Sequence, residues 1–305
     1  MLKNEFLSLN RGLVEYLTRS WKELNGFSFT NYSRKSFRRS NLEQSNYFSL
    51  KEAFEDFQWD EKCFLDSTRE LISFREKLNN AVESKDSREV FIQACSVLSW
   101  GGVLTNSITS KLLDKHHQDS LLDYMTWIVV EKPFDATSTD TNIFEKRYPE
   151  TILSDSGVTK IYAVTGNECV IYDDRVAASL CYLISNYLGE KPLNDKHGLK
   201  LVRGQRVTQK NKKGNRDPSS RNHKFLPKGP ESKNKIQHAQ SNLKANWLIS
   251  EVVINLLKTD QTFARLVDEH SHDLKFNNKM WIGMRIYESS LFMAGHTVPL
   301  TPLRE

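Results

Sequence analysis

The sequence contains few cysteines, and no two of them are spaced for a shared metal ion. Four of its 305 residues are cysteine, each in a separate apolar run, namely Cys63, Cys95, Cys169 and Cys181. Neither a CxxC nor a CxH motif occurs, so we expect no zinc site and no iron–sulfur cluster, and we predict no metal and no cofactor. Isolated free thiols are typical of the reducing cytoplasm.

Long apolar runs are also missing. No segment approaches the roughly 20 apolar residues that a membrane-spanning helix needs. Glu5 and Glu15 interrupt the N-terminal stretch, which lacks the apolar region of a secretory signal. Apolar residues make up 38% of the chain and charged residues 27%, which is typical of a globular protein with a sizeable core. We therefore expect a cytoplasmic protein without a membrane partner.

Basic residues are concentrated in one segment. From Lys196 to His238 there are 13 lysines and arginines and two acidic residues, a net charge of +11 in a chain of net charge +5, so that the remainder sums to −6. A basic segment on an acidic body is a footprint for a polyanion, although a solvated loop without a ligand explains the composition equally well. The segment is rich in Gly, Pro, Ser and Asn and has almost no apolar pattern, so residues 191–233 are predicted to form a flexible loop.

Apolar residues recur at helical spacing over most of the remaining chain. One face of a helix is formed by Leu71, Phe74, Leu78 and Val82. A second strong pattern covers 175–188 and ends at Gly189. The best strand pattern, 169–172, could equally be a loop. We predict a mainly α fold in five parts: an N-terminal arm (1–60), the N-terminal helical part of the core (61–132), a hairpin with an aspartate-bearing helix (133–190), the basic loop (191–233) and C-terminal helices that pack on the core (234–305).

Aromatic and basic residues alternate within the arm. The aromatic residues of this stretch are Tyr32, Phe37, Tyr47 and Phe48. Such rings can stack on nucleic-acid bases. We favour the alternative, in which the arm packs them onto the core.

The stretch from Gly157 to Leu180, GVTKIYAVTGNECVIYDDRVAASL, carries the most chemical information. It contains a Gly-Val turn, a short helix, a polar turn, an apolar run and two aspartates at the start of a second helix. Asp173 and Asp174 can accept hydrogen bonds from the free N–H groups of that helix. The turn could hold a phosphate on its own amides, for which we expect a positive φ at Gly157 or direct contact with the phosphate. An aspartate cap on a buried helix explains the same residues without a ligand.

This arrangement resembles the helix-hairpin-helix DNA glycosylase superfamily, of the endonuclease III and 8-oxoguanine glycosylase type. The family's hairpin reads roughly L-x-x-G-V-G-x-x-x-A, and the corresponding stretch here is LSDSGVTKIYA at 153–163; its V-D-x-x-V pattern corresponds to IYDDRV, which places Asp173 at the family's aspartate and Val176 at its second valine. The resemblance covers about residues 149–188 and implies a glycosylase-like helical core with the basic loop as an insertion. It implies that Asp173 stabilises an oxocarbenium ion or activates water, and that a hairpin lysine, here Lys160, attacks the sugar.

The sequence departs from the family pattern at three places. The second turn glycine of the family is Thr159 here. Lys160 lies one position before the family's lysine, where Ile161 stands, so whether Lys160 reaches the pocket is left open. The spacing from Gly157 to Asp173 is also shorter than in the family. The resemblance therefore supports the fold more than the activity.

These features lead to two hypotheses from different classes. In the first, the chain binds nucleic acid, DNA rather than RNA, and cleaves an N-glycosidic bond. The nucleic-acid contacts would come from the turn and the basic residues, namely Gly157, Val158, Thr159, Arg175, Lys210, Lys212, Lys213, Arg216, Arg221 and Lys224. In the second, it is a non-catalytic helical subunit of a bacterial, defence-type complex that binds a protein partner and the nucleic-acid backbone. A scaffold without nucleic acid is a third alternative.

Other residues carry weaker signals. His116 and His117 are adjacent and would point apart on a helix. His270, His272 and Asp273 follow a helix end, where histidine interacts favourably with the helix dipole. Neither site is therefore favoured for a metal. Trp100 and Trp247 could stack on a flipped base, but tryptophans at helical spacing usually belong to the core.

Overall fold

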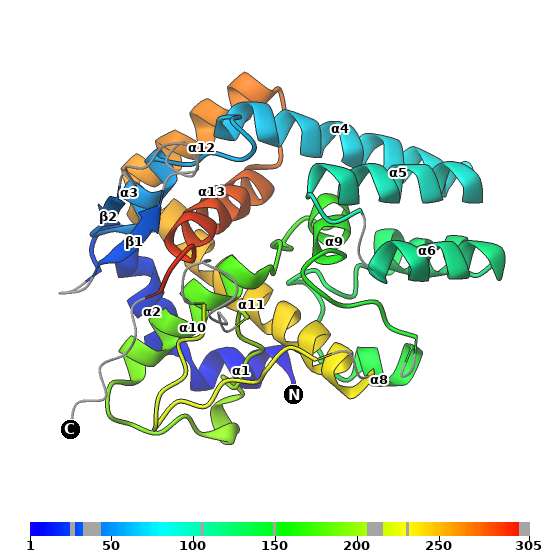
Figure 1. Cartoon of the computed structure of the whole chain (residues 1–305). Coiled ribbons are helices and arrows are strands. Elements are labelled where there is room, and N and C mark those ends of the chain that lie inside the picture. The colour runs from blue at the N-terminus through cyan, green and yellow to red at the C-terminus, as the bar shows by residue number, and fades with distance from the viewer. Residues whose placement is uncertain are drawn as a thin grey trace.

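The computed structural model describes residues 1–24, 28–32, 44–104, 107–148, 151–205, 216–229 and 232–298. Within these ranges the protein is mainly α-helical, as predicted, and its strands form a single two-stranded sheet (Figure 1). The helices are α1 (Lys3–Leu9), α2 (Arg11–Ser20), α3 (Leu50–Glu55), α4 (Phe64–Glu83), α5 (Ser87–Trp100), α6 (Ser107–His117), α7 (Leu121–Thr126), α8 (Ile143–Arg147), α9 (Thr159–Thr165), α10 (Asp174–Leu188), α11 (Ser232–Thr259), α12 (Gln261–Leu274) and α13 (Lys279–Ala294). A π-helix, η2 (Trp127–Glu131), and a 3-10 helix, η3 (Asp195–His197), complete them.

Two long helices connect the two sides of the molecule. In Figure 1, α4 runs across the top from α12 to α5, and α11 runs diagonally through the middle of the view, with one end near α8. The helices α10 and α13 lie between them and pack against each other. Both are apolar around most of their circumference, and a helix of that kind belongs in the interior. The segment before α10 passes between α9 and α13 and is hydrogen-bonded to α13 (Figure 1).

The N-terminal region is more than an arm. Residues 1–24 contain α1 and α2, whose buried side chains Phe6, Leu13 and Leu17 pack toward α11. The strands β1 (Phe29–Tyr32) and β2 (Gln44–Tyr47) pair antiparallel, with Phe29 opposite Tyr47. The polar residues of this stretch conceal its helical pattern in the sequence. Tyr47 packs in the core as favoured, whereas Phe48 is exposed and Phe37 lies outside the described residues.

The basic segment is not a free loop where the structure describes it. Leu201 and Val202 are buried, and Val202 forms a bridge with Leu226. His223 is buried as well, and its Nδ1 lies 2.6 Å from the hydroxyl of Ser185 in α10. The prediction of a flexible loop is therefore wrong for 191–205 and 216–229. The apolar anchors are spaced too irregularly to form a recognisable pattern. Lys210, Lys212 and Lys213 lie outside the described residues.

Candidate active site

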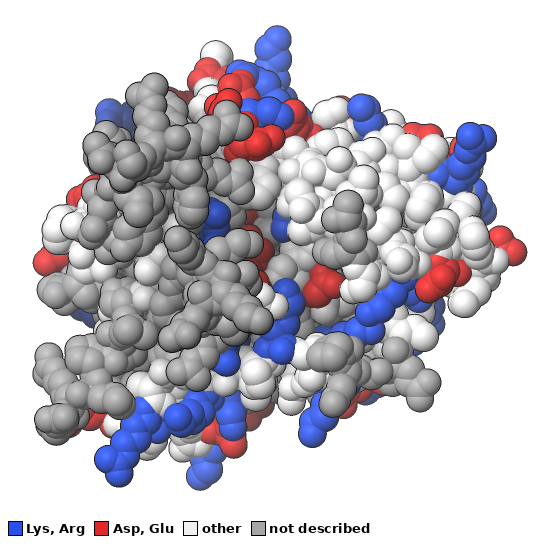
Figure 2. Space-filling view, viewed as in Figure 1, with Lys and Arg blue, Asp and Glu red and all other residues white. Residues whose placement is uncertain are grey.

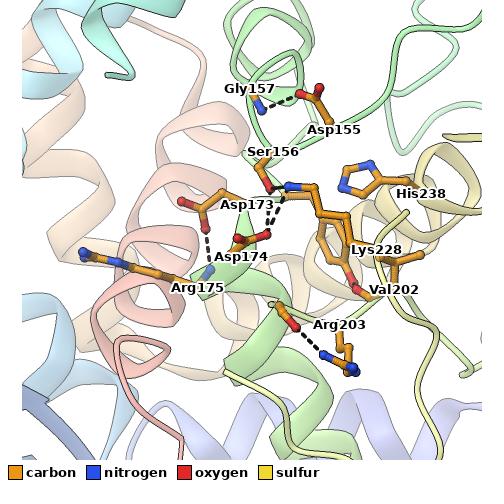
Figure 3. Close-up of polar contacts among 12 residues, drawn as sticks. Asp155, Ser156, Gly157, Asp173, Asp174, Arg175, Val202, Arg203, Lys228 and His238 are labelled. Atoms are coloured by element: carbon orange, nitrogen blue, oxygen red, sulfur yellow. Dashed lines mark hydrogen bonds and ion pairs between the residues drawn. The ribbon is translucent and has the colours of Figure 1, made fainter. Parts of the chain in front are cut away.

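Asp173 caps α10, as the sequence predicts. Its Oδ1 accepts hydrogen bonds from the backbone N–H groups of Arg175, at 2.9 Å, and Val176, at 3.0 Å (Figure 3). These are two of the N–H groups that a helix N-terminus leaves without a partner. Its other oxygen, Oδ2, accepts no hydrogen bond from the described residues. The cap therefore orients the carboxylate through Oδ1 and leaves Oδ2 available to contact a ligand.

The segment before Asp173 is held by side chains of α11 and α13. The Oδ1 atom of Asn246 accepts a hydrogen bond from the N–H of Val170 at 2.9 Å. Glu288 accepts one from the N–H of Ile171 at 2.7 Å, and Arg285 donates to the carbonyl of Cys169. The stretch 169–172 is consequently a buried loop and not a strand, because its backbone partners are side chains of helices.

A pocket opens beside Asp173. Its cavity volume is about 40 Å³, which is small beside the roughly 300–1,000 Å³ of typical small-ligand sites. Its apolar walls come from aromatic rings of the α3–α4 connection, α4, α5 and α13, namely Phe57, Trp59, Phe64, Trp100 and Phe292. In Figure 2 the molecule is hollowed near the centre of the view, and both acidic and basic side chains reach the hollow.

Lys160 extends into the same pocket. It is the second residue of α9 and only 4% exposed, and it lines the cavity together with Asp173. Its Nζ donates a hydrogen bond to the carbonyl oxygen of Ser156 at 2.9 Å. Burial lowers the pKa of Lys160, although the nearby charge of Asp173 acts in the opposite direction. The structure thus brings together the two residues that the resemblance implies to be catalytic, although Lys160 lies one position before the family's lysine.

The pocket also contains a buried ion pair that was not predicted from the sequence. Glu288 and Arg285 are both buried, with the Arg285 Nη1 atom 2.7 Å from Glu288 Oε2. Burial raises the pKa of Glu288 to about 7, although Arg285 and the Ile171 N–H act to lower it. Two charges three positions apart in the otherwise apolar α13 are a signal that could have identified this pair.

The Gly-Val turn does not fit the expected phosphate site. The described glycines with positive φ are Gly102, Gly189 and Gly198, so the expectation for Gly157 is wrong. The N–H groups of Gly157 and Val158 both donate to the Oδ1 of Asp155, at 2.7 and 3.1 Å. An aspartate two residues before the glycine therefore occupies the amides that a phosphate would need.

Thr159 is no better placed to hold a phosphate. Its backbone N–H donates to the carbonyl of Asp155 at 3.2 Å, and its side chain is fully buried. The described residues before the turn, 151–154, are not helical, so α9 is not preceded directly by a partner helix.

Asp174 has a structural role. Its Oδ1 accepts hydrogen bonds from the Ser156 hydroxyl at 3.0 Å and from Lys228 Nζ at 3.3 Å, and Lys228 also donates to Ser156 at 2.8 Å (Figure 3). Burial acts to raise the pKa of Asp174, but the charge of Lys228 and these hydrogen bonds outweigh it and lower the pKa. The second aspartate therefore ties the basic segment to the start of α10.

The remaining predicted nucleic-acid contacts do not all lie beside the pocket. The Arg175 guanidinium lies over the Phe292 ring, 4.3 Å from its centroid. Arg216 is half-buried near Asp174, and its Nε has no hydrogen-bond partner among the described residues. Arg221 and Lys224 are exposed. Between them, Asn222 donates to the carbonyl of Glu190 and His223 contacts Ser185, both at the C-terminal end of α10. Of the four cations, Arg175 and Arg216 are therefore the two near Asp173.

The weaker signals are accounted for by packing. His116 stacks on Phe91, and His270 packs against Phe64. No group of three or more His, Cys, Asp or Glu residues is placed to hold a metal ion within the described part of the chain. Trp247 is fully buried in the core, whereas Trp100 lines the pocket.

Comparisons of the chain with protein-family models, with curated proteins and with solved structures found no match. Among the described residues, no helix combines the length and apolar character that crossing a bilayer requires. The case for a function therefore depends on the pocket itself.

Proposed function

We propose that this protein binds nucleic acid and cleaves an N-glycosidic bond, with Asp173 as the carboxylate and Lys160 as the amine nucleophile. The observation that supports this proposal is the convergence of both side chains on one aromatic-walled pocket. They come from different elements, the start of α10 and the first turn of α9. A lone helix cap would need neither the cavity nor the buried lysine.

The chemistry suits a sugar that develops positive charge. As the bond from C1′ to the base breaks, the sugar approaches an oxocarbenium ion, which a fixed carboxylate stabilises. The free Oδ2 of Asp173 is available for this because the cap uses only Oδ1. Lys160 must be neutral to attack C1′, and its lowered pKa increases the neutral fraction at a given pH.

The aromatic walls suit a base that has left its stack. Enzymes that act on a base inside a duplex extrude it into a pocket, where aromatic faces replace the lost stacking. Trp59 and Trp100 lie 5.5 Å apart between centroids, and Phe292 lies 5.3 Å from Trp59. In this proposal Arg175 and Arg216, not the Gly-Val turn, supply the phosphate contacts near the pocket, and Arg221 and Lys224 contact the backbone farther along the duplex.

Covalent trapping tests the role of Lys160. An amine nucleophile forms an imine with the aldehyde of an abasic site, and borohydride reduces this imine to a stable crosslink. Wild-type protein should crosslink to a duplex with one abasic site, and Lys160→Gln should not. Lys258→Gln, which changes an exposed lysine of α11, is the matched control and should crosslink normally.

Base release tests the role of Asp173. Asp173→Asn keeps the Oδ1 acceptor of the cap but removes the charge, so it should reduce release by about 10²–10³-fold. Its melting temperature should stay within about 4 °C of the wild type. If the wild type binds duplex DNA but neither releases a base nor crosslinks, the activity is wrong and a non-catalytic subunit of a nucleic-acid complex becomes the better explanation.

A further inference from the structure

A second cavity lies beside the first and shares two of its walls, Trp59 and Trp100. Its volume is about 340 Å³, which is within the range of small-ligand sites, whereas the first cavity holds about 40 Å³. It lies where the turn at 59–62 meets α4 and the C-terminal end of α5. Neither Asp173 nor Lys160 lines it, so the proposed function does not account for it.

The apolar walls of the second cavity are three aromatic side chains, Trp59, Phe74 and Trp100. The rings of Trp59 and Trp100 lie 5.5 Å apart between centroids, and Trp59 Nε1 donates to the carbonyl of Trp100 at 3.3 Å. Phe292 packs against Trp59 from the side of the first cavity, with its ring 5.3 Å away at 74°. These contacts orient Trp59 before any ligand binds.

The polar side of the second cavity carries an excess of negative charge. The charged residues that line it are Asp60, Glu70 and Lys62. Lys62 Nζ donates to Glu70 Oε1 at 2.6 Å, and this hydrogen bond, with the charges of Glu70 and Asp60, raises the pKa of Lys62. Glu70 Oε2 is screened from water and accepts no hydrogen bond from the described residues. Two carboxylates therefore share one ammonium group, in a chain whose overall net charge is positive.

The turn that carries Asp60 has an uncommon backbone. Trp59 and Lys62 are joined by two backbone hydrogen bonds, of 3.0 and 2.9 Å. Between them, Asp60 has a φ of 50° and Glu61 a φ of 66°, a region that glycine occupies more easily than other residues. Glycine would relieve this turn, but it would remove the carboxylate that Asp60 presents to the cavity.

We propose that the second cavity binds an organic cation through an alkylated ammonium group. The faces of tryptophan and phenylalanine rings attract such a group, and the carboxylates balance its charge. An alkylated ammonium group has few or no N–H donors to satisfy, which suits walls made of rings. A metal ion does not fit, because no group of three or more His, Cys, Asp or Glu residues is placed to hold one in the part of the chain that the structure describes.

Isothermal titration of the full chain with choline tests the proposal. Choline carries a trimethylammonium group, and 3,3-dimethylbutanol has the same shape without the charge. Choline should bind, and the alcohol should bind at least about tenfold more weakly, because the charge supplies the attraction. A peptide with trimethyllysine is titrated in parallel. Tighter binding of choline assigns the site to a small molecule, tighter binding of the peptide assigns it to a modified partner, and either result supports the proposal.

Three variants locate the binding site. Glu70→Gln and Asp60→Asn each remove one negative charge, and asparagine tolerates the positive φ at position 60. Each should weaken choline binding by about fivefold or more, and Phe74→Leu, which removes a ring face, should do the same. Glu76→Gln changes an exposed residue of α4 outside the cavity and should bind choline as the wild type does. If Glu70→Gln does not fold, Asp60→Asn in the exposed turn provides the charge test.

The inference is overturned if neither choline nor the peptide binds, or if choline and the alcohol bind alike. Choline binding that is unchanged in the charge variants would also overturn it, because the cation would then lie elsewhere. No nucleic acid is present in these titrations. A failure of the proposed base release therefore leaves the cation site standing, and a failure of choline binding leaves the proposed function untouched.

Discussion

At the scale of single residues, the position of the Lys160 side chain depends on a glycine at the C-terminal end of another helix, α5. Gly101 follows α5, and a Cβ atom there would lie 2.2 Å from Cδ and 2.4 Å from Cε of Lys160. The backbone of Gly101 has a φ of −73°, so glycine is not needed for its conformation. It is needed for space, because the buried lysine stem passes directly over it.

Gly101→Ala should therefore displace Lys160. We expect covalent trapping to fall by about tenfold or more, because small displacements of a reacting group are costly. The free energy of unfolding should decrease by about 1–2 kcal/mol through crowding. Gly102→Ala is the matched control: its φ of +67° costs about 1 kcal/mol, but nothing lies within 4 Å of the added carbon. Equal trapping by the two variants in a gel assay would contradict the assigned position of Lys160.

At the scale of elements, side chains of α11 and α13 supply the backbone hydrogen-bond partners that a neighbouring strand would supply in a sheet. The loop before α10 crosses the core, where its backbone N–H groups need partners. The side chain of Asn246 accepts a hydrogen bond from the Val170 N–H and donates one to the carbonyl of Phe134 at 2.6 Å. One side chain of α11 is therefore bonded to two other segments of the chain. The loop, and with it Asp173, is placed by helices that follow it in the sequence.

Asn246→Ala should lower the free energy of unfolding by about 2–4 kcal/mol, since it leaves a buried N–H and a buried carbonyl without partners. Asn255→Ala, the control on the same helix, replaces a half-buried residue and should change the free energy of unfolding by about 0.5 kcal/mol or less. Urea unfolding of the two variants measures the difference. Similar values for both would mean that the Asn246 bridge contributes little.

At the scale of the whole molecule, two buried groups oppose each other in the pH dependence of stability. Burial raises the pKa of Glu288 from 4.5 to about 7 and lowers that of His238 from 6.5 to about 4. The fold favours protonated Glu288, so its contribution is complete below about pH 4.5 and is lost as the pH rises to about 7. The fold favours neutral His238, so its contribution is complete above about pH 6.5 and is lost as the pH falls to about 4.

The wild-type stability should therefore vary little over this range. Removing either group should reveal the pH dependence of stability due to the other, with an amplitude on the order of 3 kcal/mol. His238→Gln should become less stable as the pH rises, and Glu288→Gln should become more stable. Denaturant unfolding at several pH values between about 4 and 8 checks both slopes. Slopes of the same sign in the two variants would contradict this account.

The sequence by itself determined the helical class, the extent of α10 and the cap at Asp173. Each of these depends on neighbours within a few positions, such as the apolar spacing of 175–188, Gly189 at its end and the aspartate before it. The same local logic, applied to Asp155, would also have shown that the Gly157 turn is already satisfied.

Only the tertiary structure decided what surrounds Asp173. The pocket joins residues from α4, α5, α9 and α13, and the side chain of Lys160 enters it because α9 packs against α4 and α5. The packing of Leu201, Val202 and Phe225 in the basic segment is equally non-local. Such contacts depend on how helices distant in sequence meet, and a one-position shift along α9 would change the side that Lys160 faces. Local spacing predicts an element, but packing between elements determines which side chains share a pocket.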